Sequence, residues 1–590
     1  MNLKKLGLLG LLFLGFNLTA APIKHLIQMP NPQSHYFDVT TTLDVSKEKT
    51  PYIDLKMAAW TPGSYLIREF AKNVEQVSAK SGSQSLPISK TSKNTWRINL
   101  PPGLKSVEVH YQVYAYELSV RTSFLDDVHG YINPASVLLY VDKFAKMPQE
   151  LSIVPHKDFK KVSTALKNVG GFNYIAKDLD ELIDSPIEIG NHQVWSFKVN
   201  NIPHQIAFFG QTKVDSLKFI ADVTKMAQTA QNVVGQHPCD HYLFIIHNIQ
   251  RGTGGLEHLY STTCSVSRSS YETVSGYQGV LNLLAHEYFH LWNVKRIRPM
   301  ALGPFDYENE NYTHNLWFSE GITSYYADLI NLRTGMVPAD VYVSELGKEI
   351  SAVENTPGNQ IESAASASWD AWIKYYRPNE NSRNSTVSYY DKGSLLGGVL
   401  NMWIIEKTNG SKCLDDVFRL LYQNYYLKQG RGFTDAELEN AFTSVAGTSA
   451  TGFFKDHIYG VKTPDYAGLF SKFGYTWTDA NQGKSIPFAG FSAASNRVTS
   501  IYKNGPAFIA GLNVGDEIVS VNQANFAGLD KLMADKKVGD QLQFLIKRDG
   551  LERSFELKLE QTPLKAFEIQ SVASPTEAQM TLRKKWLALN

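Results

Sequence analysis

The alternation of apolar and polar residues predicts a β-rich first third of the chain. Between residues 22 and 210, apolar residues recur at every second position in HYFDVTTTLDV, NTWRINL, VEVHYQVYAYEL and HQVWSFKVN. This period is typical of strands that bury one face. Turn signals such as the PPG at 101–103 separate these segments. We therefore expect a β-sandwich-like domain over residues 21–212.

Residues 213–470 show a mixed pattern that becomes mainly helical. DSLKFIADVTKMAQTAQNVV has a helical period and precedes a strand-like run at 240–248. Further helices are predicted at residues 316–335, 391–410, 415–428 and 433–447. We expect one α/β domain here, with a helical C-terminal part.

The end of the chain forms a separate predicted unit. Residues 497–523 show the pattern strand, turn, short helix, turn and strand, and residues 540–559 predict a hairpin. We expect a domain over residues 475–562, followed by a tail at 563–590 that contains a loop and a helix. The fold class is thus multidomain α/β.

The first residues have the pattern of a secretory signal peptide. Lys4 and Lys5 precede an apolar stretch at 6–16, and small residues follow around Ala20. We expect cleavage after Ala20, so that residues 1–20 are removed and the protein is exported, to the periplasm or outside the cell. An uncleaved membrane anchor is the alternative, although no later stretch is long and apolar enough to span a bilayer.

Composition and charge exclude several classes of protein. With 43% apolar and 19% charged residues, the chain is globular rather than disordered. The formal net charge of +1 gives no electrostatic basis for binding nucleic acid. Three cysteines are too few for a disulfide framework. A hairpin joining residues 240–248 to 256–263 would bring Cys239 and Cys264 together, and whether they form a disulfide stays open.

The segment LLAHEYFHLWN, residues 283–293, places three polar groups among apolar residues. His286 and His290 are four residues apart, so both imidazoles can reach one metal ion from a helix. Glu287 lies beside them and can activate a water without ligating the metal. Satisfied core histidines are the alternative. Burying such groups unpaired costs several kcal/mol, which a bound zinc ion offsets.

A third zinc ligand is predicted in the next helix. Glu320 lies within WFSEGI at 317–322, an apolar setting near a helix N-terminus. Three protein ligands leave one zinc position open for water, as catalytic sites require. An exposed glutamate that complements the helix dipole is the alternative for Glu320, and His314 is a rival ligand. Arg296 and Arg298 could bind a peptide carboxylate, but a solvated face is the preferred interpretation for them.

These motifs together resemble the gluzincin metallopeptidases, which have a thermolysin-like catalytic domain. GGLEH at 254–258 resembles the edge strand of gluzincin aminopeptidases, whose glutamate, here Glu257, holds the free amino group of the substrate. YDKG at 390–393 resembles their Y-E-K-G, whose tyrosine, here Tyr390, stabilises the oxyanion. Gly254 and Gly255 then allow the substrate backbone to approach the strand.

Two departures and the C-terminal unit point to a narrower resemblance. The spacing from His290 to Glu320 is longer than in most such aminopeptidases, and His258 replaces the usual asparagine. NGPA, AGL and GDEIVSVN, between residues 504 and 522, resemble a PDZ domain. WTPGSY at 60–65 and REF at 68–70 also have counterparts in the family. The chain thus resembles the glycyl aminopeptidases that carry a C-terminal PDZ domain.

The PDZ resemblance also suggests a peptide-binding loop. Its backbone N–H groups could receive the C-terminal carboxylate of a peptide that adds as a strand. A groove that the catalytic domain blocks is the alternative, and both interpretations stay open. The loop residues are Phe488, Ala489, Gly490 and Phe491.

The resemblance implies an aminopeptidase that uses one Zn²⁺ ion and cleaves peptides with a free N-terminus, and the leader pattern implies that it is exported. His286, His290 and Glu320 bind the metal, while a zinc-activated water attacks with Glu287 as general base. A preference for glycine or alanine is implied by the family alone. The alternatives are a non-catalytic PDZ protein that binds peptides like a chaperone, and a zinc endopeptidase. Glu257 distinguishes a zinc endopeptidase from an aminopeptidase, because only an aminopeptidase needs it to bind the free amine of the substrate.

Overall fold

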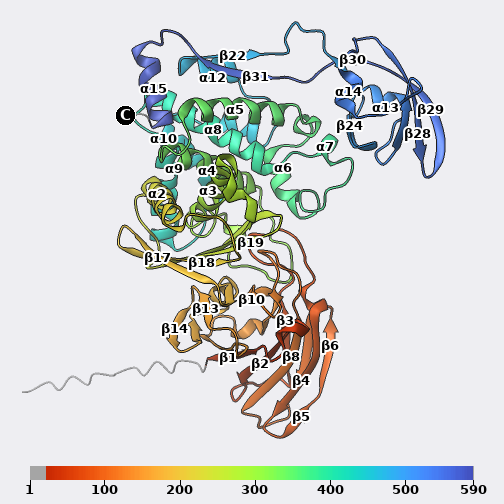
Figure 1. The fold of residues 1–590 in the computed structure, drawn as a ribbon. Helices are drawn as coiled ribbons and strands as arrows, with labels where there is room; N and C mark the ends of the chain where they lie inside the picture. The colour runs from red at the N-terminus through yellow and green to blue at the C-terminus, as the bar shows by residue number, and fades with distance from the viewer. Residues whose placement is uncertain (1–21, 589–590) are drawn as a thin grey trace, which may run out of the picture.

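The computed structural model describes residues 22–588 (Figure 1). The expected signal peptide and its cleavage site lie outside this range. Within residues 22–588, no helix combines the length and the apolar character that crossing a bilayer requires.

The N-terminal domain consists of packed β-sheets, as predicted from the alternating pattern. Its largest sheet contains, in spatial order, β14 (Lys167–Gly170), β15 (Asn173–Ala176), β12 (Gln149–Val154), β1 (Ile23–Gln28), β2 (Tyr36–Asp44), β8 (Ser106–Tyr114), β4 (Val74–Ser81) and β5 (Gln84–Leu86). A four-stranded sheet contains β11 (Leu139–Tyr140), β3 (Tyr52–Met57), β7 (Thr95–Asn99) and β6 (Ile88–Ser92). Val39 of β2 and Leu55 of β3 share one buried core, which makes this arrangement a sandwich.

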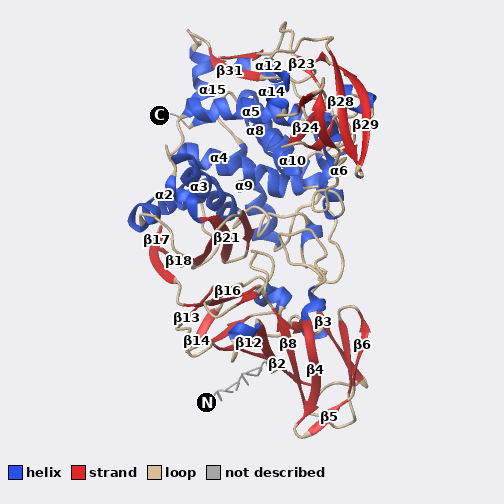
Figure 2. Cartoon of the chain, turned by 45° about the vertical axis from the view of Figure 1, so that its right-hand side comes forward, coloured by secondary structure: helices blue, strands red, loops and turns tan. Residues whose placement is uncertain are grey.

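A smaller sheet of the same domain lies toward the middle of the molecule (Figure 2). It contains β13 (Lys161–Thr164), β16 (Ile187–Gly190), β10 (His129–Ile132) and β9 (Phe124–Leu125). All four residues of β10 and of β16 are buried, as in a sheet covered on both faces.

A five-stranded sheet opens the catalytic domain, and it begins earlier than the sequence pattern indicated. The order is β17 (Gln193–Val199), β18 (Ile202–Phe209), β19 (Tyr242–Ile249), β21 (Ser261–Ser267) and β20 (Thr253–Glu257). Because β18 pairs with β19, the strands at 193–209 belong to this sheet and not to the N-terminal sandwich. The expected boundary at residue 212 therefore lies two strands too late.

The expected hairpin that would join Cys239 to Cys264 is absent from the described structure. β19 runs parallel to β21, with Ile246 opposite Cys264. Cys239 lies seven positions before Ile246, and at about 3.3 Å per residue it is far from Cys264 along the sheet. Both cysteines are free thiols.

Helices cover the five-stranded sheet and extend beyond it (Figure 2). The principal ones are α2 (Ser216–Val234), α3 (Val274–Phe289), α4 (Ile322–Arg333), α5 (Ala339–Glu354), α8 (Tyr389–Lys407), α9 (Leu414–Leu421), α10 (Asp435–Ala446) and α12 (Tyr466–Lys472). Phe244 of the sheet, Leu284 of α3 and Leu400 of α8 belong to one continuous core. This core fixes the end of α3, where the predicted metal ligands lie.

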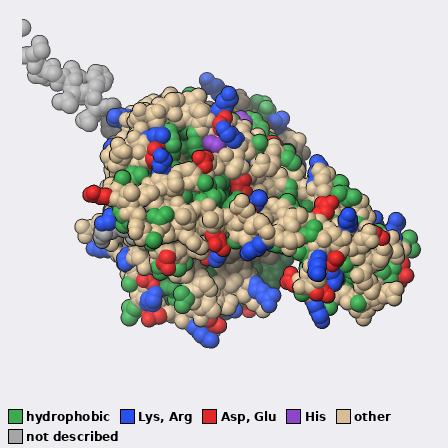
Figure 3. Space-filling model, turned by 90° about the horizontal axis from the view of Figure 1, so that it is seen from above, with side chains coloured by type: hydrophobic (Ala, Val, Ile, Leu, Met, Phe, Trp, Pro, Cys, Tyr) green, Lys and Arg blue, Asp and Glu red, His purple; other side chains and the backbone are tan. Residues whose placement is uncertain are grey.

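The PDZ unit forms a lobe that projects from the body of the molecule (Figures 1 and 3). Its sheet contains β24 (Phe491–Ala494), β25 (Arg497–Ile501), β26 (Glu517–Val521), β28 (Gln541–Arg548) and β29 (Leu551–Lys558), with helices α13 (Pro506–Ala510) and α14 (Leu529–Met533). It has a core of its own. Where it meets the helical part, the Asn384 side chain donates to the carbonyl of Ile501 at 2.8 Å.

The chain returns from the PDZ unit to the catalytic domain. β31 (Phe567–Ser571) pairs with β22 (Tyr475–Asp479), the strand that precedes the PDZ unit. Helix α15 (Glu577–Leu587) then buries Trp586 completely in the main core. The PDZ unit is therefore held at both of its ends, and within the expected tail both β31 and α15 pack against the catalytic domain.

Candidate active site

The end of α3 presents the first two predicted ligands. His286 lies in the last turn of the helix, and His290 is the residue that ends it. Leu284 and Phe289 anchor this turn in the core, since both are fully buried. The Nε2 atoms of the two histidines face each other at 3.0 Å.

Glu320 reaches the same point from a π-helical turn, Trp317–Gly321, that leads into α4. π-Helical turns are rare and recur at functional sites. The Glu320 Oε2 atom lies 3.2 Å from His290 Nε2 and 3.7 Å from His286 Nε2. The rival ligand His314 is not part of this group; its ring stacks on Trp369.

The three donor atoms fit a tetrahedral metal ion. Their separations run from 3.0 to 3.7 Å. Ligands bonded at about 2.0–2.1 Å in a tetrahedron lie about 3.3 Å apart, within this range. Burial opposes ionisation of Glu320, but the charge of His290 and hydrogen bonds from both histidines outweigh it and lower the pKa of Glu320 to about 2. An anionic ligand beside two imidazoles is a zinc-type donor set.

Outer contacts orient both imidazoles. The backbone carbonyl of Asn293 accepts a hydrogen bond from His290 Nδ1 at 2.8 Å. The Ser324 hydroxyl donates to the carbonyl of Glu320 at 3.1 Å and so accepts from His286 Nδ1 at 3.3 Å. Each Nδ1 therefore carries a proton, and each Nε2 becomes free to bind a metal once it releases the proton that it shares with Glu320.

Glu287 is buried beside the predicted ligands, and one oxygen of its carboxylate, Oε2, makes no hydrogen bond to the described residues. A Cβ atom on Gly255 would lie only 2.0 Å from Glu287 Oε1, so glycine is needed at that position of β20. Burial raises the pKa of Glu287 to about 8. A carboxylate in such a setting is suited to accept a proton.

Glu257 lies at the end of the edge strand β20 and faces the same cavity. It is 4% exposed, and one of its oxygens lies within 4.8 Å of ligand atoms of Glu287 and His290. Gly63 of the N-terminal domain packs on it: a Cβ atom there would lie 2.5 Å from Glu257 Oε2. Within the described residues, the outer edge of β20, with Gly254 and Gly255, has no paired strand.

Tyr390 enters the cavity from the start of α8. Its ring centre lies 6.2 Å from that of His286. The position of Tyr390 depends on a close contact between α8 and the turn that leads into α4. A Cβ atom on Gly321 would lie 2.5 Å from the Cα atom of Gly393, so only glycine allows this contact. The YDKG and EG motifs therefore touch each other, and their glycines permit it.

The cavity has a volume of about 410 Å³ and is lined by residues of both domains. All the predicted metal ligands, with Glu287, Glu257, Gly255 and Tyr390, line it. Arg121 and Tyr376, which were not predicted as site residues, also line the cavity. Neither was Tyr65, whose hydroxyl lies 3.5 Å from Glu320 Oε1. Tyr65 belongs to the WTPGSY motif, which was a usable signal. Arg121 stands in no motif.

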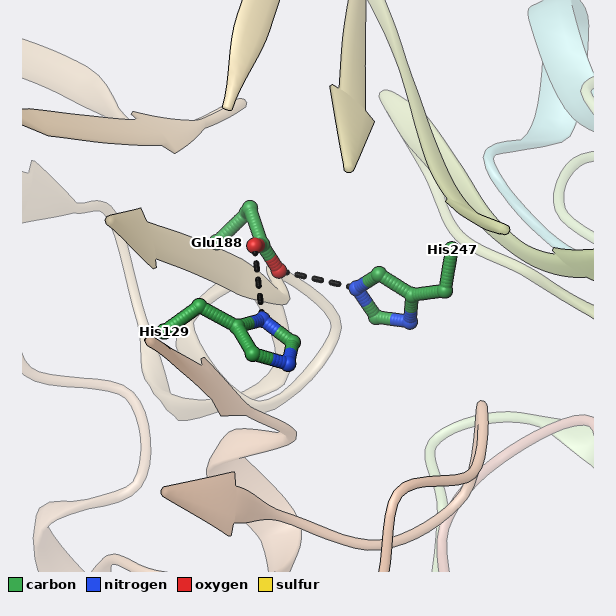
Figure 4. A group of neighbouring side chains, drawn as sticks. All are labelled: His129, Glu188 and His247. Atoms are coloured by element: carbon green, nitrogen blue, oxygen red, sulfur yellow. Dashed lines mark hydrogen bonds and ion pairs between the residues drawn. The ribbon is translucent and has the colours of Figure 1, made fainter. Parts of the chain in front are cut away.

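A second cluster of two histidines and a glutamate is not arranged as the predicted zinc site is. His129, Glu188 and His247 are buried where β10, β16 and β19 meet (Figure 4). One carboxylate oxygen accepts from His129 Nδ1 at 3.0 Å and the other from His247 Nε2 at 2.8 Å. The two rings converge on the carboxylate and not on a shared point, so this is a buried polar bridge between two domains.

Arg296 does not lie on a solvated face as expected. It is 2% exposed, and its guanidinium donates to the carbonyls of Leu291 at 2.7 Å and Leu259 at 3.1 Å. Arg296 therefore supports the chain that leaves α3. Arg298 is also partly buried.

The predicted PDZ loop has its own internal bonds. The carbonyl of Ala489 accepts from Ala507 N at 3.0 Å, and that of Gly490 from Tyr502 N at 2.9 Å. Gly490 adopts the left-handed region, with φ of 76°. Phe488 lies in the short strand β23 (Pro487–Phe488) and Phe491 begins β24. In the described sheet β24 is an edge strand, and the contact with Asn384 is made by β25.

Comparisons with known proteins agree with this architecture. The family model of the peptidase M61 N-terminal domain matches residues 24–191, that of M61 glycyl aminopeptidase matches 279–396, and that of the PDZ domain matches 482–559. No curated relative matches the sequence.

Solved structures extend the likeness to the whole chain. An aminopeptidase N family protein from Idiomarina loihiensis is 29% identical, with a TM-score of 0.89 over 96% of this chain and 100% of that one. An M1 zinc metallopeptidase from Deinococcus radiodurans is 13% identical, with a TM-score of 0.49 over 76% of this chain and 95% of that one, a likeness too low to support an argument. The three matched domains, in this order and around this site, show that the chain belongs to the M61 glycyl aminopeptidases, a family of metallopeptidases, and carries a C-terminal PDZ domain.

Proposed function

We propose that this protein is an exported zinc aminopeptidase that removes small N-terminal residues, glycine or alanine, from peptides. The observation that carries this proposal is the convergence of His286, His290 and Glu320 in one cavity with two further carboxylates, Glu287 and Glu257. Three ligands suit a catalytic zinc ion, and the two extra carboxylates have separate uses there.

The chemistry of each group follows from its place. His286, His290 and Glu320 would hold a zinc ion, which would supply a Lewis acid for the scissile carbonyl and would lower the pKa of a water molecule. Glu287 accepts the proton of the attacking water and passes it to the departing amine. The hydroxyl of Tyr390 donates a hydrogen bond to the oxygen that becomes negative during attack.

Glu257 provides the reason for attack at the N-terminus. Its buried carboxylate has no ion-pair partner among residues 22–588, and the ammonium group of a peptide supplies one. Binding the ammonium group there places the first peptide bond, and no later one, beside Glu287. Gly63 packs directly on Glu257, which leaves little room around the first residue and supports a preference for small side chains.

The export of the protein is proposed from the leader pattern at residues 1–20. A mass spectrum of the mature protein purified from its host checks this proposal. An N-terminus at Ala21 supports it, and retention of Met1 contradicts it.

Chelation and a Glu287→Gln variant test the catalytic assignment. We expect hydrolysis of glycyl and alanyl p-nitroanilides by the untreated protein, loss on chelation and recovery with added zinc. Glu287→Gln should bind zinc as wild type does and lose at least about 1,000-fold in kcat, because the carboxylate is no ligand but moves the proton. Stoichiometric zinc without any hydrolysis would favour the peptide-binding alternative.

A further inference from the structure

The edge strand β20 brings three groups past the cavity in a fixed order. Glu257 stands at one end, and Gly255 lies against Glu287. At Gly254 the strand meets Arg121, whose Nη1 atom lies 3.8 Å from the position of a Cβ atom. At about 3.3 Å per residue, Glu257 and Gly254 are about 10 Å apart. A peptide whose amine binds Glu257 and whose first bond lies beside Glu287 therefore directs its next group toward Arg121.

Arg121 lines the cavity but pairs with no carboxylate. It comes from the loop between β8 and β9 of the N-terminal domain. No carboxylate of residues 22–588 lies within 4.0 Å of its guanidinium nitrogens, and its buried Nε has no hydrogen-bond acceptor. A buried donor without an acceptor carries a free-energy cost. A ligand with an anionic group removes that cost.

A second guanidinium lies close to the first. The Arg68 side chain donates to the Ser64 hydroxyl at 2.9 Å, and its buried Nε also has no acceptor among the described residues. Burial, and then the positive charge of Arg121, lower the pKa of Arg68. The REF motif at 68–70 thus adds positive charge next to the cavity. Two neighbouring cations without a carboxylate partner favour an anion between or beside them.

The loop that carries Arg121 is held in place by buried contacts. The Asn133 side chain donates to the carbonyl of Arg121 at 3.1 Å and to the Thr61 hydroxyl at 3.3 Å. The Ser119 hydroxyl accepts from the backbone N–H of Arg121 at 3.2 Å. Asn133 therefore connects this loop to the WTPGSY loop that covers Glu257. Both ends of the substrate site are fixed relative to each other before a substrate binds.

We propose that Arg121 binds the free C-terminal carboxylate of a dipeptide, so that the cavity selects substrates that end one residue after the cleaved bond. This inference rests on the proposed aminopeptidase function and adds a substrate class to it. The ammonium group binds Glu257 at one end, and the carboxylate binds Arg121 at the other. Both charges of a dipeptide are thereby matched across the two domains.

The test compares substrates that differ only in the charge beyond the scissile bond. We expect kcat/KM for Ala-Ala to exceed that for Ala-Ala amide by about 10- to 100-fold, the range that a charge-assisted hydrogen bond gives. Arg121→Gln should reduce this ratio to near 1, and Arg121→Lys should keep part of it. Arg251→Gln removes an exposed arginine just before β20 and should leave the ratio at its wild-type value.

Other outcomes overturn the inference. A ratio near 1 in the wild type, or a wild-type ratio in Arg121→Gln, contradicts carboxylate binding by Arg121. Hydrolysis of Ala-Asp amide as fast as Ala-Ala would assign Arg121 to an acidic side chain instead. Because the ratio compares two substrates on one enzyme, a partial folding defect does not change it. If neither substrate is cleaved, the proposed function fails, whereas cleavage of both without discrimination removes only the role of Arg121.

Discussion

The three predicted metal ligands are held in place by residues that are not ligands themselves. Ser324 fixes the ring of His286, and the backbone of Asn293 fixes that of His290. The Asn293 side chain in turn donates to the carbonyl of Phe318 at 2.8 Å, within the turn that carries Glu320. Asn293 thus fixes the position of His290 through its backbone and that of the Glu320 turn through its side chain.

Removing the Ser324 hydroxyl tests this arrangement. We expect Ser324→Ala to weaken zinc binding by about 10-fold, because such outer contacts orient the ligand and raise its basicity. Competition with a chromogenic chelator measures the affinity. The control Ser366→Ala alters a serine away from the site, in α6 (Ala364–Trp369), and should change nothing. Equal affinities of Ser324→Ala and wild type would show that the ring is held by its packing alone.

Local spacing made part of the site predictable. His286, Glu287 and His290 are neighbours in sequence, and the EG and YDKG motifs depend on glycines that permit a helix contact. The place of Arg121 at the cavity could not be predicted, because a loop without a sequence pattern carries it and only the docking of two domains brings it there. The same reason hides the contact between Gly63 and Glu257.

At the scale of the elements, alternation identified the strands but not their partners. β17 and β18 have the pattern of the N-terminal strands, yet they pair with β19 in another sheet. The hydrophobic pattern of a strand indicates that one of its faces is buried, but it does not indicate with which sheet the strand pairs. The parallel pairing of β19 with β21, which separates the two cysteines, is hidden for the same reason.

The bridge between β10, β16 and β19 connects the two domains and depends on pH. The charges of His129 and His247 outweigh the burial of Glu188 and lower its pKa to about 2, from an ordinary 4.5. A depressed carboxyl pKa stabilises the fold above about pH 4.5, and this stabilisation is lost as the pH falls toward about 2.

Glu188→Gln tests the bridge. We expect a loss of about 3–5 kcal/mol in the free energy of unfolding at pH 7, because a buried pair loses one partner. Urea unfolding at several pH values measures it, and the difference from wild type should narrow as the pH falls below about 4.5. The control Glu69→Gln affects an exposed pair with Lys93 and should cost less than about 1 kcal/mol. A difference that does not change with pH would contradict the account.

At the scale of the whole molecule, the PDZ unit interrupts the catalytic domain. The chain leaves along β22 and returns along β31, and α15 then packs against α4 and α8. The sequence pattern predicted the helix of the tail but not its docking, because the partner surface is formed by helices far away in the sequence. Positions before and after the PDZ unit are thereby coupled to the core that holds the site.

Trp586→Ala tests this coupling. The side chain is fully buried, so its removal should cost about 3–5 kcal/mol. Thermal unfolding measures the loss, and we expect catalysis to fall at temperatures well below the wild-type midpoint. Trp369→Ala, at a half-exposed tryptophan, is the matched control and should cost less. An unchanged midpoint for Trp586→Ala would show that α15 does not contribute to the core.

The central claim is tested most directly by comparing substrates with free and blocked amines. We would measure kcat/KM of the zinc-loaded protein for alanyl p-nitroanilide and for its N-acetylated form. The account predicts cleavage of the free amine alone, since Glu257 binds the ammonium group and places the first bond beside Glu287. Equal cleavage of the acetylated substrate would contradict it and identify an endopeptidase.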